Sequence, residues 1–365
     1  MKKQTEKNIL YCLIIIILVL TTYTGILFYE STFREILKKI NIILLILFTF
    51  FLILMQKNSK EYLEKVLILI ILTLFLRDFY LSFFIIIISN FVDKKIRLKI
   101  LFFILCSFYS CTLVLNNLGY LEFNNIPYRK IFRHALGFNH PNTAMSLLLP
   151  IFSLLYYIYF SKYKKILIVI ILIIGKIIFD FTYSRTTFLL IILFIFLIFL
   201  KDKFIEKIKF LFLIEGFLIA FLTFFLPFYF RNTILNTLFS ERLALFYYYL
   251  TNHEITLFGY EKIKEFYKLY PLDNVYLKVL FENGFLGFIL LIILIFITMY
   301  LFFKNKDYQA IRIFSVILIF GFMERTALYY YLNVVYFIIS DYIFKNINKN
   351  YKGEKNERNY KKNIK

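Results

Sequence analysis

Long apolar stretches follow one another along almost the whole of this 365-residue chain. Several of them approach the ~20 residues that an α-helix needs to cross a bilayer. Hydrophobic residues make up 61% of the sequence and the mean hydropathy is +0.73, which argues against a water-soluble globule. We therefore expect an all-α fold, a polytopic integral membrane protein with about 12 transmembrane helices and one large outer loop.

Short polar or basic segments separate the expected spans. The spans are Asn8–Phe28, Ile40–Met55, Val66–Leu76, Tyr80–Val92, Leu98–Leu118, Ala144–Phe160, Ile166–Phe181, Thr187–Leu200, Phe210–Phe230, Gly284–Phe303, Ile313–Met323 and Ala327–Phe344. Residues 1–344 then form one membrane domain with its large outer loop at 231–282, and residues 345–365 form a basic cytoplasmic tail. The first apolar run is long enough to remain as an anchor, so no cleavable signal is expected.

The pair Arg77-Asp78 decides the topology, because it divides the apolar residues 66–92 into two short helices. If residues 66–92 formed one helix, every later loop would change sides. With the division, the loops 92–99, 161–165, 201–209 and 304–312 share one side with the tail and carry most of the basic residues. The positive-inside rule places that side and both termini in the cytoplasm, and it points the alternate loops outward.

Arginine is distributed differently from lysine. Most arginines fall in segments expected to face outward, whereas most lysines fall in cytoplasmic ones. A guanidinium binds phosphate oxygens in pairs and keeps its charge at any working pH, so the outer face suits a phosphate-bearing ligand. For Arg34, Arg77 and Arg231, an anchoring role at the membrane interface is an equally good alternative.

The net charge of +21 is explained by the cytoplasmic loops, so no nucleic-acid partner is expected. Cys12, Cys106 and Cys111 all lie within apolar runs and have no metal-ligand spacing. Neither a metal ion nor a cofactor is therefore expected.

A basic, turn-containing stretch at residues 128–146 lies between two apolar runs and reads YRKIFRHALGFNHPNTAMS. Its glycine and proline allow a tight turn that holds His140 and Asn142 at the membrane surface. Asn142 has an alternative role as the N-cap of the following helix. The run from Arg133 to Asn142 resembles the R-x-x-x-G-F-x-H-P-N signature of Wzy-type polysaccharide polymerases.

The large loop carries further motifs in a fixed order. These are Glu241-Arg242, Phe258-Gly259-Tyr260, Asp273-Asn274-Val275-Tyr276-Leu277 and a glycine before the next span, at Gly284. The order resembles the outer loop of the O-antigen ligase and polymerase superfamily. Ligase-like members have histidine at the position of Asp273, so the aspartate favours the polymerase branch. Gly287 is expected to allow close helix packing.

Two short outer turns complete the set. Arg185 lies in a tight hairpin near the membrane plane, with an end anchor as the alternative, and Lys176 in the preceding span snorkels or faces the interior. Glu324, followed by Arg325, is similar to a Glu in the last helical pair of these polymerases, with a locally paired couple as the alternative. The aromatic run 246–249 stacks on sugars or, as the favoured interpretation, lies in the aromatic belt.

The resemblance implies a glycosyltransferase that polymerises polyprenyl-diphosphate-linked oligosaccharide repeat units at the outer face of the bacterial plasma membrane. The product would be a capsular polysaccharide, an exopolysaccharide or O-antigen. Its partners would be undecaprenyl-diphosphate-linked oligosaccharides and membrane lipid, together with a flippase and a chain-length regulator. The alternatives are a ligase that moves finished chains to another acceptor, and a flippase or other transporter of lipid-linked oligosaccharides.

In the implied reaction, a sugar hydroxyl attacks the anomeric carbon of the growing chain and the lipid diphosphate leaves. Arginines compensate the charge of the leaving group, and Asp273 or His140 acts as the base, with Asp273 favoured. The expected catalytic residues are Arg185, Arg242, Asp273 and His140. The expected substrate-binding residues are Arg133, Asn142, Asn274, Tyr276, Glu324 and Arg325.

Overall fold

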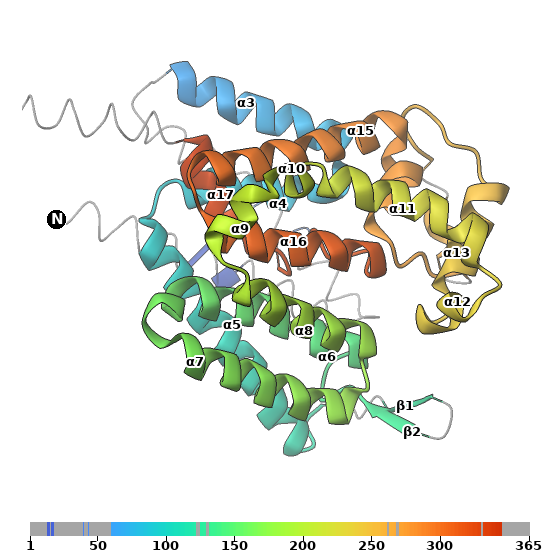
Figure 1. The fold of residues 1–365 in the computed structure, drawn as a ribbon, viewed down its shortest axis with the longest axis horizontal. Helices are drawn as coiled ribbons and strands as arrows, with labels where there is room; N and C mark the ends of the chain where they lie inside the picture. Colours follow the sequence, from blue (N-terminus) through green and yellow to red (C-terminus); the bar gives the residue numbers. More distant parts are fainter. Residues whose placement is uncertain are drawn as a thin grey trace, which may run out of the picture.

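The apolar runs form helices that pack beside one another (Figure 1), which confirms the all-α expectation. The structure is a computed structural model that describes residues 13–14, 16–17, 39, 43, 60–121, 125–128, 131–260, 263–267, 270–329 and 331–344. The first elements are α3 (Lys60–Phe75), η1 (Arg77–Phe79), α4 (Tyr80–Ser89), α5 (Lys94–Asn117), β1 (Asn125–Tyr128), β2 (Ile131–His134), α6 (Pro141–Ser146) and α7 (Leu148–Thr182). Then follow α8 (Arg185–Phe199), α9 (Asp202–Lys207), α10 (Lys209–Leu213), α11 (Glu215–Phe230), α12 (Ile234–Leu238), α13 (Arg242–Asn252), α14 (Ile263–Phe266), α15 (Val275–Lys304), α16 (Tyr308–Met323) and α17 (Val335–Ile343).

The predicted division of residues 66–92 is confirmed. α3 ends at Phe75, the turn η1 holds Arg77 and Asp78, and α4 begins at Tyr80. The two helices contact each other along the hairpin. This hairpin is the arrangement on which the predicted sides of the later loops depend.

α7 is a pair of antiparallel helices joined by a break at Tyr163, where φ is −131° and ψ is 34°. A straight helix of its 35 residues would be about 52 Å long. The guanidinium of Arg133 nevertheless bonds both to the carbonyl of Thr182, at the end of α7, and to the side chain of Asn142, just ahead of its beginning. The chain thus reverses at the break, which confirms the predicted hairpin with its loop at 161–165.

Side chains at one end of the bundle join the loops predicted to be cytoplasmic. Arg312 donates to the carbonyls that end α8 and to Asp202, and Lys94 pairs with Asp307 at 3.3 Å. Arg97 is fully buried and donates to carbonyl oxygens of α4 and α17. Basic side chains commonly satisfy the unpaired carbonyls of helix ends in this way. The grouping of these loops is confirmed, and their cytoplasmic location stays a prediction.

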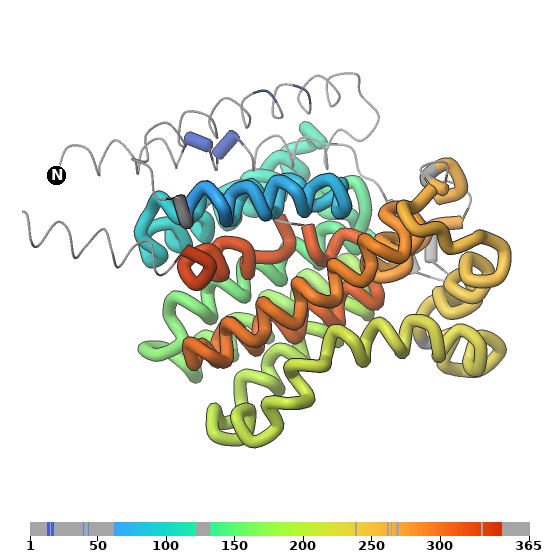
Figure 2. Tube along the Cα trace, turned by 90° about the horizontal axis from the view of Figure 1, so that it is seen from above, coloured from blue at the N-terminus to red at the C-terminus, as the bar shows by residue number. Residues whose placement is uncertain are grey.

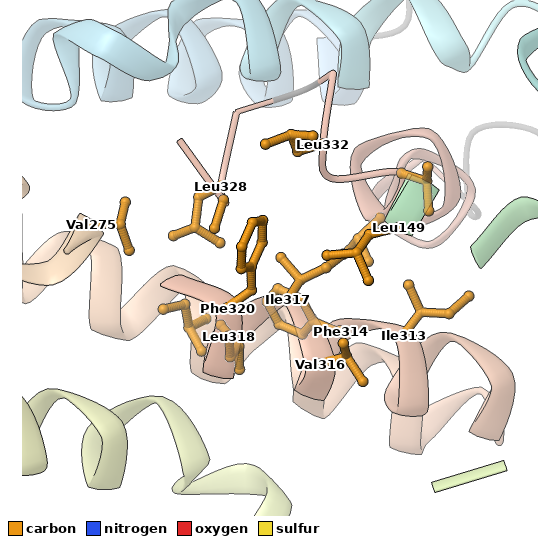
Figure 3. Packing of buried hydrophobic residues seen from close by; sticks show 14 of the residues in the cluster. Leu149, Val275, Ile313, Phe314, Val316, Ile317, Leu318, Phe320, Leu328 and Leu332 are labelled. Atoms are coloured by element: carbon orange, nitrogen blue, oxygen red, sulfur yellow. The ribbon is translucent and has the colours of Figure 1, made fainter. Parts of the chain in front are cut away.

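α16 is surrounded by other helices, and almost every one of its side chains is buried. Figure 3 shows its apolar residues packed against side chains from α7, α15 and the segment after α16. The labelled residues are Leu149, Val275, Ile313, Phe314, Val316, Ile317, Leu318, Phe320, Leu328 and Leu332. A helix that is apolar all round is typical of such a buried position.

Among the described residues, two helices, α5 and α15, are long and apolar enough to cross a membrane by length and composition, and α8, α11 and α16 are shorter apolar helices. Many large apolar side chains on α3, α7, α8, α11 and α15 are exposed. Extended exposed apolar surfaces are typical of membrane or protein contacts. The first two expected spans fall almost wholly outside the described residues, so the expected number of about 12 spans stays a prediction.

The sequence did not predict the antiparallel hairpin formed by β1 and β2. Its register pairs Asn125 with His134 and Ile126 with Arg133. Figure 1 shows the hairpin projecting beyond the helices, and β2 contacts α7. The hairpin holds the first basic motif against the end of α7.

The large loop folds back onto a break in α15. At Gly284 the backbone leaves helical geometry, with φ of 76°, and divides α15 into two helices. The amide of Phe285 donates to the carbonyl of Thr256, and the amide of Tyr260 donates to the carbonyl of Phe281. The loop thereby satisfies backbone groups that the break would otherwise leave unpaired. Figure 2 shows the α12–α13 region at one end of the bundle, on the right.

Candidate functional site

His140 begins the first part of the site by capping α6. Its backbone is extended, and its Nδ1 accepts a hydrogen bond of 3.0 Å from the amide of Asn142. Pro141 occupies the first helical position, where a missing amide hydrogen costs nothing. The alternative that Asn142 is the N-cap is therefore wrong, because the helix starts one residue before it.

Arg133 clamps three elements together. Its Nε donates to the carbonyl of Thr182 at 2.8 Å, and its Nη2 donates to Oδ1 of Asn142. This guanidinium, expected to bind the substrate, therefore uses at least two of its donors within the protein. Arg133 holds the end of α7 and the start of α6 in place beside His140.

The centre of the site is an ion pair between Arg242 and Asp273. Nη2 of Arg242 lies 3.0 Å from Oδ2 of Asp273, and its Nη1 donates to Oγ1 of Thr186 at 3.5 Å. The Arg242 side chain is 10% exposed and the Asp273 side chain 28% exposed. The loop thus brings Arg242 beside the α7–α8 turn, the segment that also contains Arg185.

Arg185 lies at the rim of this centre. It is the first residue of α8, and its amide donates to the carbonyl of Tyr183, which has a left-handed backbone with φ of 48°. The residue is exposed, while the neighbouring Thr186 is half-buried beside Arg242. Both arginines expected to hold a diphosphate therefore belong to the same end of the bundle.

The pKa of His140 is affected by charged residues from both parts of the site, Arg133 in the first part and Asp273 and Arg242 at the centre. Burial lowers the pKa of His140 and so does the charge of Arg133, while the Asp273 carboxylate raises it and the Arg242 guanidinium lowers it again. The imidazole is therefore neutral at pH 7. Since its Nδ1 accepts a hydrogen bond, the proton lies on Nε2, which can donate but cannot accept.

Glu324 belongs to the same centre. It follows α16, is half-buried, and accepts a hydrogen bond of 3.1 Å from Oγ1 of Thr326. Burial raises the pKa of Glu324 to about 7, and the nearby Asp273 carboxylate contributes to the rise. Arg325 points its guanidinium over the ring of Tyr267, 5.9 Å from the centroid. Glu324 and Arg325 thus have separate partners, contrary to the alternative of a simple local couple.

Two of the expected substrate-binding residues have structural contacts instead. Asn274 caps α15 by accepting from the amide of Leu277, and it donates to the carbonyl of Phe322 at 3.0 Å. The Tyr276 hydroxyl donates to the carbonyl of Leu318 at 3.0 Å. Both side chains are fully buried. We therefore correct their assignment, because they fasten α15 to α16 and are not available to a substrate.

A second polar cluster lies next to the site, and none of the sequence motifs identified it. Lys278 is 8% exposed and bonds to Asp78 and to the hydroxyl of Tyr329, while its Nζ lies 3.8 Å from Oε2 of Glu282. The spacing of Lys278 and Glu282, four residues apart in a stretch that becomes helical, is a signal that could have drawn attention to them. Their partner Asp78 comes from the distant turn η1, which no local pattern reveals.

The aromatic run 246–249 is mainly part of the core. Phe246 and Tyr249 are fully buried, so neither sugar stacking nor an interface belt describes them. The Tyr247 ring lies 3.6 Å from the guanidinium carbon of Arg231, which fits the anchoring alternative for that arginine. Lys176 pairs with Asp180 on an exposed face of α7, so its predicted alternative of facing the interior is wrong.

Within the described residues, no three His, Cys, Asp or Glu side chains gather in a way that could hold a metal ion. Comparison with protein-family models, with curated proteins and with solved structures finds no match.

Proposed function

We propose that this chain is a membrane glycosyltransferase that joins lipid-diphosphate-linked oligosaccharide repeat units into a polysaccharide at the outer face of a bacterial plasma membrane. The observation that carries the proposal is the gathering of Arg242, Asp273, His140 and Glu324 at one end of an apolar helical bundle, with Arg185 at the rim. A guanidinium held in place beside two carboxyl groups offers charge compensation for a leaving diphosphate and a group to accept a proton.

The membrane setting is supported by the apolar helices and by the exposed apolar faces around the bundle. The predicted orientation in the membrane is supported by the two polar ends of the bundle. Loops that the sequence assigns to the cytoplasm by their basic residues contact one another at one end of the bundle. Catalytic and anchoring groups gather at the end that the sequence assigns to the outside, where lipid diphosphates that have been moved across the membrane are found.

A transporter is less well supported. A path for sugars would need polar groups along the middle of the bundle. The apolar cavity of about 90 Å³ between α3, α4, α15, α16 and α17 is lined by residues such as Leu76, Phe79, Leu291, Phe314 and Ile339. The ion pairs described above lie at the bundle ends.

Deletion of the gene is expected to leave single repeat units on the lipid diphosphate, because assembly and translocation of each unit precede polymerisation. The measurement is mass spectrometry of lipid-linked oligosaccharides in spheroplasts, with enzymatic digestion from outside to locate the units. Accumulation confined to the inner leaflet would identify a transporter. Normal polymer length with loss of attachment to a final acceptor would identify a ligase.

A cysteine at Asn252, an exposed residue of α13, is expected to react with a membrane-impermeant maleimide in intact cells. A cysteine at Lys203, an exposed residue of α9, is expected to react only after lysis. The background is a variant in which the three native cysteines are replaced by alanine. The reversed pattern would place the candidate site in the cytoplasm and rule out the proposed reaction.

A further inference from the structure

The start of α15, which follows Asp273, and the end of α16, which precedes Glu324, are fastened to each other near Arg242. Asn274 donates to the carbonyl of Phe322 at 3.0 Å and fastens the start of α15 to the end of α16. Asp273 directly precedes Asn274, and Glu324 follows Phe322 at the end of α16. The charge of Asp273 acts on Glu324 through space, as does that of Arg242.

The surroundings of the two carboxyl groups differ. Asp273 forms an ion pair of 3.0 Å with Arg242, a charge-assisted contact that engages one of its oxygens. Glu324 accepts a hydrogen bond from the neutral hydroxyl of Thr326. Burial and the Asp273 carboxylate favour its protonated form, against the opposing effects of Arg242, of Thr326 and of Arg325. The Tyr331 hydroxyl also faces Glu324 and bonds to Thr326 in the same segment.

When two neighbouring carboxyl groups have such different surroundings, they can take different roles in acid–base catalysis. The Asp273 carboxylate is held in an ion pair with Arg242. The one without that partner takes up and releases a proton near neutral pH, where a general base is most effective. The neutral His140 does not compete for the role, because its unprotonated nitrogen already accepts the amide of Asn142.

We propose that Glu324 is the general base of the polymerisation and that Asp273 is a positioning residue that holds Arg242 toward the diphosphate. In this step the acceptor hydroxyl gives its proton to the Glu324 carboxylate as its oxygen bonds to the anomeric carbon. The bond from that carbon to the phosphate oxygen breaks, and the lipid diphosphate leaves with the electron pair. The proposal rests on the proposed function and reverses the expectation that Asp273 is the base.

The experiment measures polymer formation by the purified full-length protein in lipid vesicles as a function of pH. The substrate is the pool of lipid-linked repeat units extracted from the deletion strain. Because the base must be ionised, the wild-type rate should fall as the pH drops through about 7. Glu324→Gln should lower kcat by ~10²-fold or more and lose this acid limb, with little change in KM. Glu324→Asp should keep part of the activity and retain an acid limb.

Glu254→Gln is the matched control, since Glu254 is an exposed glutamate of the large outer loop, and it should match the wild type. Asp273→Asn should lower the rate, and the acid limb should persist at a lower pH, because Glu324 remains but loses a carboxylate that raises its pKa. If Glu324→Gln stays active with an unchanged pH profile, or if the acid limb disappears in Asp273→Asn instead, Glu324 is not the base. If the wild-type protein itself forms no polymer, the proposed function fails and the assignment of the base fails with it.

Discussion

Arg242→Lys is expected to lower polymer synthesis about 10²-fold although the positive charge is kept. Arg242 already divides its guanidinium between Asp273, at 3.0 Å, and Thr186, at 3.5 Å. Its planar fork lets it hold both partners and still present donors to a diphosphate. A lysine ammonium at the same place can follow Asp273 or the leaving group, but it cannot keep the fixed geometry that bridges them.

The large expected effect follows from the proposed reaction, in which the leaving diphosphate gains negative charge in the transition state. A donor already held in place stabilises that charge more than it stabilises the ground state, and so it raises the rate rather than the affinity alone. The measurement is polymer chain length and rate of synthesis in cells that carry equal amounts of each variant in the membrane. Arg242→Ala is expected to be at least as damaging as Arg242→Lys.

Arg231 provides the matched control. Its guanidinium lies on the ring of Tyr247 at the end of α11, and we assign it an anchoring role. Arg231→Lys should therefore leave the polymer unchanged at equal membrane levels. Full-length polymer from both Arg242 variants would show that Arg242 does not stabilise the leaving group. If Arg231→Lys lost as much polymer synthesis as the Arg242 variants, the assay would be reporting general damage to the protein.

The sequence predicted which segments meet because hydropathy and the distribution of basic residues act along the whole chain. The division at Arg77-Asp78, the reversal at 161–165 and the grouping of the loops all follow from these two patterns. The resemblance of the motifs then selected Arg242 and Asp273, which the structure joins in an ion pair. Long-range order of this kind can be predicted without knowledge of individual side-chain contacts.

The roles of individual polar residues could not be predicted in the same way. Arg133 meets the carbonyl of Thr182, which is 49 residues away, and Asn274 meets the carbonyl of Phe322, which is 48 residues away. A motif shows that a side chain is polar and where it lies in the sequence. Whether it binds the protein's own backbone or remains available to a ligand depends on partners from distant helices.

The choice between Asp273 and Glu324 illustrates the same limit. Family resemblance favours the aspartate in the long motif, and nothing in the local sequence shows that it pairs with Arg242. In the fold the aspartate is occupied by an ion pair with Arg242, while burial raises the pKa of the glutamate. The acid–base assignment is therefore a property of the assembled site and not of either motif.

Gly259→Ala is expected to destabilise the protein by roughly 4 kcal/mol or more, which places it among the most damaging single substitutions. An added Cβ at Gly259 would lie 2.2 Å from the carbonyl oxygen of Glu282 and 2.7 Å from the amide nitrogen of Asn283. Both atoms belong to backbone beside the break in α15, so no side chain can move aside. The backbone of Gly259 also has φ of +83°, which adds strain of about 1 kcal/mol for alanine.

Gly119→Ala separates the two causes. Gly119 has φ of +77°, close to that of Gly259, but a Cβ there would meet nothing within 4 Å. This variant should therefore show only the backbone strain, about 1 kcal/mol, and retain activity. The measurement is the thermal unfolding midpoint of each purified variant in detergent, together with its yield. A large loss for Gly259→Ala and a small one for Gly119→Ala would support the close contact of the loop with α15. Equal losses would mean that residues 256–260 do not pack against the break in α15. That result would contradict the folded-back conformation of the loop.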